Sequence, residues 1–234
     1  MTKPCTVRFD DNPVINSLSF HSLDLSFSTQ NEITLPEIYS DDAYKSYDIF
    51  TAASIGDTES IQQFIKAKLP LDLLNSFSWS ALMYAAHGGH FQTCVQLLQY
   101  GATVDVYGDG KKTPLILASA CGNVDVVKLL INAGANIHWK DVNGDTALSA
   151  ATLYSHSVVV ELLLKHGADP NSRNKSGMTP TLLACTTGHE LTLTSILQYG
   201  GDVNVKNNKG EDGRAITDSP KLLAILNAIP KASF

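Results

Sequence analysis

One interval, 33 residues long, recurs through most of this chain and restricts the folds that it can adopt. Alanine occupies the same place in five consecutive intervals, with no insertion between them, at Ala52, Ala85, Ala118, Ala151 and Ala184. A strict repeat of about 20–50 residues is typical of a solenoid, whose units stack because none can bury its own apolar face. The sequence therefore predicts a long stacked surface with no enclosed pocket, which favours a binding protein.

Other columns of residues keep this interval and indicate two helices per unit. Glycine recurs at Gly56, Gly89, Gly122 and Gly188, and Ser155 stands in the fourth place. These glycines are expected to end a short first helix, since they permit a positive φ. A second glycine column is expected to end the second helix, at Gly101, Gly134, Gly167 and Gly200.

The segments between the helical columns indicate helix starts and turns. Thr113-Pro114 and Thr179-Pro180 place a capping hydroxyl before a proline in the first helical turn. Polar stretches such as 141–144 (DVNG) and 174–177 (NKSG) suit hairpin loops that project from one edge of a stack. The predicted fold class is an all-α repeat.

The repeated segments resemble the ankyrin repeat. They read SALMYAAHGGH (80–90), TPLILASACGN (113–123), TALSAATLYSH (146–156) and TPTLLACTTGH (179–189). The resemblance implies an ankyrin-type solenoid of paired antiparallel helices with hairpin loops.

Within this family, the chain resembles the ankyrin block of the ankyrin-repeat and SAM-domain scaffold proteins, especially the third member. The similarity covers about residues 16–228 and includes TAASIGD (51–57) and KDVNGDTAL (140–148). The chain stops after the repeats and contains no SAM domain, so polymerisation through such a domain is not expected.

The register predicts a repeat domain over residues 46–228, between an acidic leader (1–45) and a short tail (229–234). A helix around residues 221–228 is expected to close the stack. The leader carries three basic and seven acidic residues. It is either a loose segment or a local strand, since Leu23, Leu25 and Phe27 alternate with polar residues. Within the domain, the expected repeats are 46–75, 76–106, 107–138, 139–171 and 172–204, with a truncated C-terminal cap at 205–228.

Composition argues against several classes of partner. The net charge is −6 and no basic face stands out, so neither nucleic acid nor an anionic membrane is an expected partner. No signal peptide and no apolar run of about 18 residues is present, so membrane insertion is not expected. The four cysteines lack CxxC spacing and are interpreted as reduced residues of a cytoplasmic protein.

Enzymatic chemistry has little support in the sequence. His87 and His90 have HxxH spacing, but the register supplies no third ligand for a metal ion. His90 and His189 fit instead the position of the repeat that makes hydrogen bonds at turns. No GxSxG nucleophile motif or phosphate-binding glycine loop occurs. We therefore predict no enzyme, no cofactor and no metal site.

Candidate partner-binding residues lie beside the shared columns, at positions that differ between repeats. Aromatic side chains concentrate there on repeats two to four, and aromatic residues are enriched at interface hot spots. Trp139 fits equally well a packing contact between adjacent loops. The predicted partner-binding residues are Trp79, Tyr84, His87, Tyr107, Lys112, Leu117, Trp139, Leu153, Tyr154 and Arg173.

These features predict a non-enzymatic scaffold or adaptor that is monomeric by itself. The family resemblance implies NIMA-related protein kinases and other ankyrin-repeat scaffolds as partners, at cilia or in endocytic trafficking and moulting. It also implies membrane-associated complexes at those sites. The alternative is an inhibitor that occupies the surface of a protein kinase or another enzyme.

Overall fold

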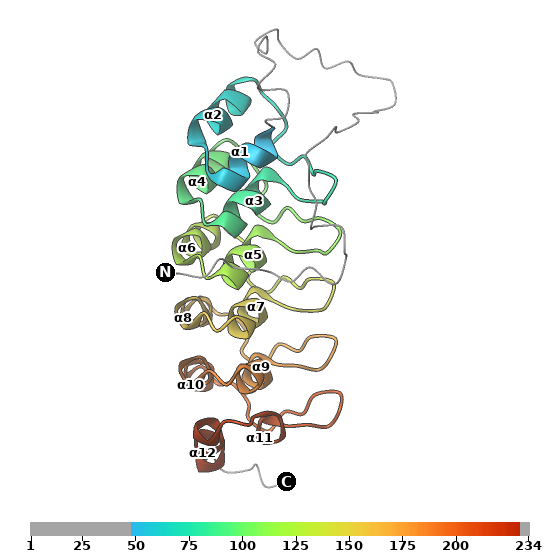
Figure 1. Cartoon of the computed structure of the whole chain (residues 1–234), viewed down its shortest axis with the longest axis vertical. Helices are drawn as coiled ribbons and strands as arrows, with labels where there is room; N and C mark the ends of the chain where they lie inside the picture. The colour runs from blue at the N-terminus through green and yellow to red at the C-terminus, as the bar shows by residue number, and fades with distance from the viewer. Residues whose placement is uncertain (1–47, 230–234) are drawn as a thin grey trace. The chain divides into compact units, whose positions relative to one another are not determined.

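The computed structural model describes residues 48–229, which form two parallel rows of α-helices (Figure 1). The described residues contain no strand. The first row consists of α1 (Ile49–Ile55), α3 (Ala81–Gly88), α5 (Pro114–Cys121), α7 (Ala147–Leu153), α9 (Pro180–Thr187) and α11 (Gly213–Ile216). The second row consists of α2 (Thr58–Lys66), α4 (Phe91–Gln99), α6 (Val124–Asn132), α8 (Ser157–Lys165), α10 (Glu190–Gln198) and α12 (Pro220–Ala228).

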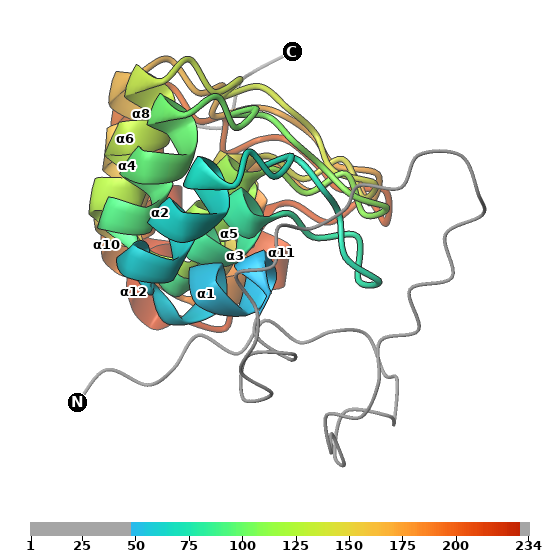
Figure 2. The same ribbon diagram turned by 90° about the horizontal axis from the view of Figure 1, so that it is seen from above.

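Each helix packs on its predecessor and successor in the same row and on its partner in the other row. For example, α5 lies between α3 and α7 and also contacts α6. The loops that join one repeat to the next all project toward the same side (Figure 2). This arrangement confirms the predicted all-α repeat solenoid of paired helices.

The first-row helices α5 and α9 begin directly after the Thr-Pro capping residues that the sequence indicated. The Thr113 and Thr179 side chains cap α5 and α9, accepting hydrogen bonds from the backbone N–H groups of Ile116 and Leu182. Proline follows each cap in the first turn, where its missing N–H breaks no helical hydrogen bond. These caps fix the ends of the short helices that the neighbouring repeats then bury.

The repeated columns form one continuous core. All five alanines of the 33-residue series have no exposed surface, and the same holds for Leu97, Leu130, Leu163 and Ile196 in the second row. The alanines are small enough to let first-row helices approach closely, while the second row supplies the large apolar side chains. Stability therefore depends on contacts between units rather than within one unit.

The glycine columns adopt the expected left-handed conformation. Gly56, Gly89, Gly122 and Gly188 have φ between 71° and 77° and follow first-row helices. Among the described residues, four that are not glycine also have positive φ, and each stands in register with glycines of other repeats. They are Lys68, Ser78, Lys111 and Ser155.

The loops have a repeated hairpin geometry held by side-chain caps. In the loop before α7, the Asp141 carboxylate accepts hydrogen bonds from the N–H groups of Asn143 and Asp145. The Asn174 side-chain oxygen makes the equivalent pair of contacts in the next loop. Successive loops are also joined directly, because the Lys175 N–H donates to the Asn143 carbonyl at 2.8 Å. The loops thus form an ordered ridge along the stack.

Some predictions concern residues that the structure does not describe. The leader at 1–45, including the alternating Leu23, Leu25 and Phe27, lies outside the described residues, as does the tail beyond Ile229. The predicted closing helix at 221–228 is present as α12, and the Arg214 guanidinium donates hydrogen bonds to the Leu226 and Ile229 carbonyls at its end.

Candidate protein-binding surface

An aromatic cluster surrounds Trp79 at the start of the second repeat. Trp79 ends the loop before α3, and Tyr84 and His87 lie three residues apart on one face of that helix. The Trp79 ring centroid is 5.0 Å from that of Tyr84 and 5.4 Å from that of His87. Phe50 of α1 extends the cluster, with its centroid 6.3 Å from that of Tyr84. The structure therefore brings three of the predicted residues together.

Tyr84 is held in place at both ends of its side chain. Its ring packs between Phe50 and Trp79, and its hydroxyl accepts a hydrogen bond of 2.8 Å from the Asn75 side-chain amide. Burial raises the pKa of the Tyr84 hydroxyl above its ordinary value, although the Asn75 contact opposes this shift. Tyr84 is therefore a neutral, oriented hydroxyl on a partly exposed apolar surface.

His87 packs as an aromatic side chain against Trp79. Burial lowers the pKa of His87 below 6.5, and the nearby Lys112 ammonium lowers this pKa further. Its Nε2 atom is buried and has no hydrogen-bond partner in the structure. A neutral imidazole on Trp79 is the state favoured at neutral pH.

A second aromatic pair joins the following two loops. The Tyr107 and Trp139 ring centroids are 4.8 Å apart, and the Trp139 indole N–H donates to the Lys111 carbonyl at 2.8 Å. Trp139 therefore makes the packing contact between adjacent loops that was one of its two expected roles. Tyr107 remains 45% exposed, so it still presents one face to solvent. Trp139 thus positions Tyr107.

Leu153 and Tyr154 lie further along the stack, where α7 ends. Leu153 is 46% exposed and Tyr154 is 37% exposed. Leu153 stands two 33-residue intervals after His87, at the equivalent helix position. The two residues therefore extend the apolar surface of the first row toward the fourth repeat.

The prediction that Leu117 offers an exposed contact is wrong. Leu117 is only 1% exposed, as α5 is flanked by α3 and α7 and buries its first seven residues. Sequence register placed Leu117 beside the shared alanine, but register alone does not tell which face of the helix is covered.

The two predicted basic residues have different surroundings. Lys112 lies near His87 and Asp145. Its positive charge opposes protonation of both groups and so acts to lower the pKa of each, in addition to the larger effect of burial. Arg173 lies in the exposed loop before α9, and its guanidinium donates to the Lys206 carbonyl of the next loop at 2.6 Å. Arg173 therefore belongs to the loop ridge and not to the aromatic cluster.

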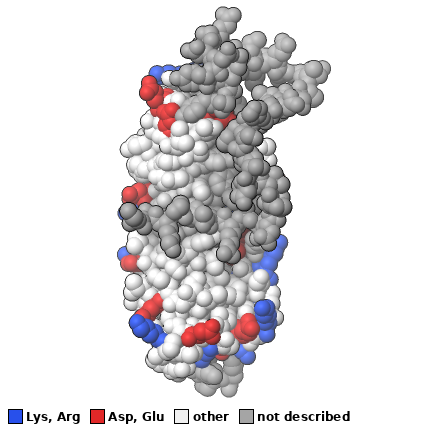
Figure 3. Space-filling view, in the orientation of Figure 1, with Lys and Arg blue, Asp and Glu red and all other residues white. Residues whose placement is uncertain are grey.

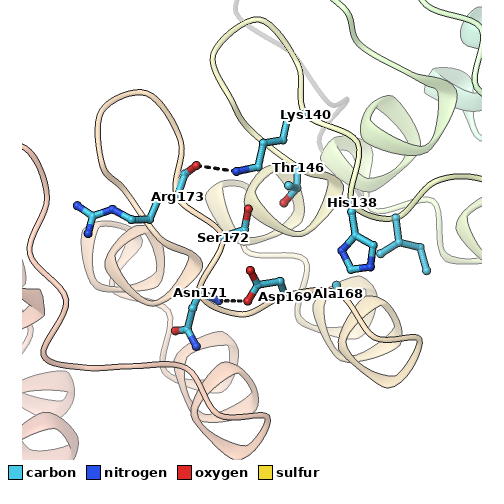
Figure 4. Close-up of a pocket in the computed structure, with 9 residues that line it drawn as sticks. His138, Lys140, Thr146, Ala168, Asp169, Asn171, Ser172 and Arg173 are labelled. Atoms are coloured by element: carbon cyan, nitrogen blue, oxygen red, sulfur yellow. Dashed lines mark hydrogen bonds between the residues drawn. The ribbon is translucent and has the colours of Figure 1, made fainter.

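A shallow hollow lies between the loops before α7 and α9 (Figure 4). Its volume is about 260 Å³, and its lining includes His138, Lys140, Asp169 and Arg173. Small-molecule sites are usually larger, about 300–1,000 Å³, and mostly apolar. The hollow is therefore smaller than a typical small-molecule site, and its lining includes charged side chains.

Within the described residues, no three His, Cys, Asp or Glu side chains are arranged to hold a metal ion. In that same part of the chain, none of the helices is sufficiently long and apolar to span a membrane.

Comparison with known protein families matches "Ankyrin repeats (3 copies)" at residues 49–141 and again at 128–207. These two matches together span more than half of the chain. The chain belongs to the ankyrin-repeat family. A comparison with curated proteins found no match.

Family membership establishes the general type of this surface. Ankyrin repeats are protein–protein interaction modules, and proteins built from them are generally non-enzymatic. The aromatic clusters lie on the first row and the adjoining loops of this ankyrin stack, where side chains differ between repeats.

Two contacting residues of the ankyrin loops were not among the predicted site residues. Lys140 and Lys206 stand one interval before and one interval after Arg173. The Lys140 ammonium donates to the Arg173 carbonyl at 2.9 Å (Figure 4). The shared interval could have indicated this series, because it places three cations at equivalent points of successive loops.

Proposed function

We propose that this ankyrin-repeat chain is a non-enzymatic scaffold that holds other proteins together. One observation carries the proposal: Trp79, Tyr84 and His87 form a packed aromatic surface outside the shared columns of the repeat. Oriented aromatic side chains lose little entropy on binding, and truncation of such residues can cost about 2 kcal/mol or more. Tyr107, Leu153 and Tyr154 extend this surface over repeats two to four.

The proposed partners are NIMA-related protein kinases and other ankyrin-repeat scaffolds. This finer assignment, and a setting at cilia or in endocytic trafficking and moulting, follows from the resemblance to the ankyrin-repeat and SAM-domain scaffolds. The ordered rings and caps support a rigid surface that would meet a partner with little rearrangement.

The test is a binding assay with a matched pair of tyrosine variants. Tyr107→Ala/Tyr154→Ala removes two exposed tyrosines near the first row and the loops, whereas Tyr100→Ala/Tyr199→Ala removes two exposed tyrosines at the ends of α4 and α10. Capture of a NIMA-related kinase should weaken at least about tenfold in the first variant alone. Equal capture by both variants would overturn this use of the surface.

A kinase assay separates the scaffold from an inhibitor. Addition of the purified chain to the kinase that it captures should leave peptide phosphorylation unchanged or raised. Falling activity with rising chain concentration would favour the inhibitor, which must occupy the kinase surface.

A further inference from the structure

Five basic side chains occupy the outer parts of the last three loops. Their gathering is visible as blue atoms along the loop edge in the lower part of Figure 3. All five are exposed, and none forms an ion pair within residues 48–229. They are Lys140, Arg173, Lys175, Lys206 and Lys209. We call this set the basic ridge.

Three members of the basic ridge are held in a series by the fold. The Lys140 ammonium donates to the Arg173 carbonyl, and the Arg173 guanidinium donates to the Lys206 carbonyl. Carbonyl contacts orient the cations but, unlike carboxylate contacts, do not neutralise their charge. The ammonium and guanidinium groups also keep further N–H donors for an external ligand.

The acidic residues of the same loops are arranged differently. Each of the six accepts a hydrogen bond from a backbone N–H or an asparagine amide. Asp141, for example, is 8% exposed and binds two backbone N–H groups, and Glu211 accepts from the Asn207 amide. The remaining acids are Asp145, Asp169, Asp202 and Asp212. The acids are thus engaged within the loops, whereas none of the five cations forms an ion pair within residues 48–229. The charge of Lys140 does partly offset the rise in the pKa of Asp145 that burial causes.

We propose that the basic ridge binds an extended acidic segment of a partner protein, with carboxylates at every third residue. The inference rests on the proposed scaffold function and names the chemistry of one partner segment. Packed helices lie about 8–10 Å apart, so equivalent cations of successive loops are separated by a similar distance. A polyproline II segment has three residues per turn and advances about 9 Å in that turn, which places every third side chain on one side.

A protein segment suits the ridge better than nucleic acid. The chain as a whole has a net charge of −6, which opposes a polyanion that extends beyond the ridge. In the three basic loops, Trp139 is only partly exposed and already stacks on Tyr107, and the exposed Tyr199 lies where the last loop leaves α10. The loops therefore offer no series of free aromatic faces on which successive bases could stack. A short protein segment with separated carboxylates does not extend beyond the ridge and needs no aromatic faces for stacking.

The test measures binding of a fluorescein-labelled peptide of Glu-Pro-Pro repeats by fluorescence anisotropy. The wild-type chain should bind it, more weakly as salt rises, and should not bind the Gln-Pro-Pro counterpart. Lys140→Gln/Arg173→Gln/Lys206→Gln should weaken binding by about tenfold or more. The matched control Lys66→Gln/Lys128→Gln/Lys165→Gln removes the same charge from the second row and should bind as wild type.

Several results would overturn the proposal. These are equal loss in both triple variants, no binding of the Glu-Pro-Pro peptide, or equal binding of a peptide in which the same glutamates are clustered. Tighter binding of single-stranded DNA than of the peptide would assign the ridge to another ligand. If the ridge variant still captures the kinase while the Tyr107/Tyr154 variant does not, the scaffold function stands and the ridge inference alone fails.

Discussion

Histidine side chains that lie next to the positive-φ glycines form hydrogen bonds from one repeat to the preceding one. The Nε2–H group of His90 donates to the Ser54 carbonyl at 2.8 Å, and His156 donates to the Ala120 carbonyl at 2.9 Å. A Cβ atom added at the intervening Gly56 would come within 2.4 Å of the His90 ring. Glycine at this position therefore provides both the positive φ and the room for the histidine.

Ser155 interrupts this arrangement at the next junction. It adopts a φ of 60°, and His189 caps its own helix through Thr192 instead of bridging backward. We predict that Ser155→Gly stabilises the chain by about 1–2 kcal/mol, because it relieves left-handed strain and makes room for a His189 bridge to the Leu153 carbonyl. Urea unfolding of both chains measures this gain.

Two variants separate the bridge from the strain. Lys68→Gly relieves a similar φ of 56°, but the glycines in its register have no neighbour within 4 Å of an added Cβ. It should gain only about 0.5 kcal/mol. In a His189→Ala background, Ser155→Gly should raise the free energy of unfolding by no more than Lys68→Gly does. A gain of about 1–2 kcal/mol in that background would contradict the proposed hydrogen bond from His189 to the Leu153 carbonyl.

The lowered pKa of His87 predicts a pH-dependent stability. Folding disfavours the charged imidazole, so the unfolded chain binds more protons between the folded-state pKa and 6.5. The contribution of neutral His87 is complete above pH 6.5 and is lost as the pH falls through this window. The free energy of unfolding should therefore fall less between about pH 7.5 and 5 in His87→Phe than in wild type.

Lys112→Gln tests the cause of the His87 shift. Removal of this charge should raise the pKa of His87, as followed by NMR titration, but should leave it below 6.5 because burial is the larger cause. A pKa that reaches or exceeds 6.5 would show that burial contributes little.

The loop before α5 differs from its neighbours at the scale of the element. Gly108 takes the position at which Asn75, Asp141 and Asn174 cap their loops. A Cβ atom at Gly108 would lie 1.8 Å from the Ser78 carbonyl oxygen of the preceding loop. This second loop therefore packs against the first by close backbone approach.

We expect Gly108→Ala to destabilise the chain by about 2 kcal/mol or more, because the Ser78 backbone must move. Gly110→Ala is the matched control. Its added Cβ would meet only the Lys112 side chain, at 3.9 Å, so it should change stability by less than about 0.5 kcal/mol. Thermal unfolding compares the two; similar losses would mean that loop flexibility, not the close contact, matters.

Sequence register predicted the helices and their ends because the same local signals recur in each repeat. Thr113-Pro114 and the positive-φ glycines act within a few residues, so their effect is readable without a structure. The outcome for Leu117 and His189 is not local in this way: two flanking helices bury Leu117, and His189, whose register partner is Ser155 instead of glycine, bonds to Thr192 of its own helix. Such inter-repeat contacts determine the candidate site and are only partly encoded in one unit.

At the scale of the whole stack, the principal helix contacts of the described residues join each repeat to its neighbours, so a change at one end should remain local. Arg214 holds the C-terminal pair α11 and α12 through the Leu226 and Ile229 carbonyls. Arg214→Gln should therefore speed hydrogen exchange of α11 and α12 and leave protection in α1 to α6 unchanged. Opening of α11 and α12 removes principal helix contacts only from the adjoining helices α9 and α10, so α1 to α6 keep their own packing. A loss of protection along all the helices would instead mean that the stack unfolds as a single cooperative unit.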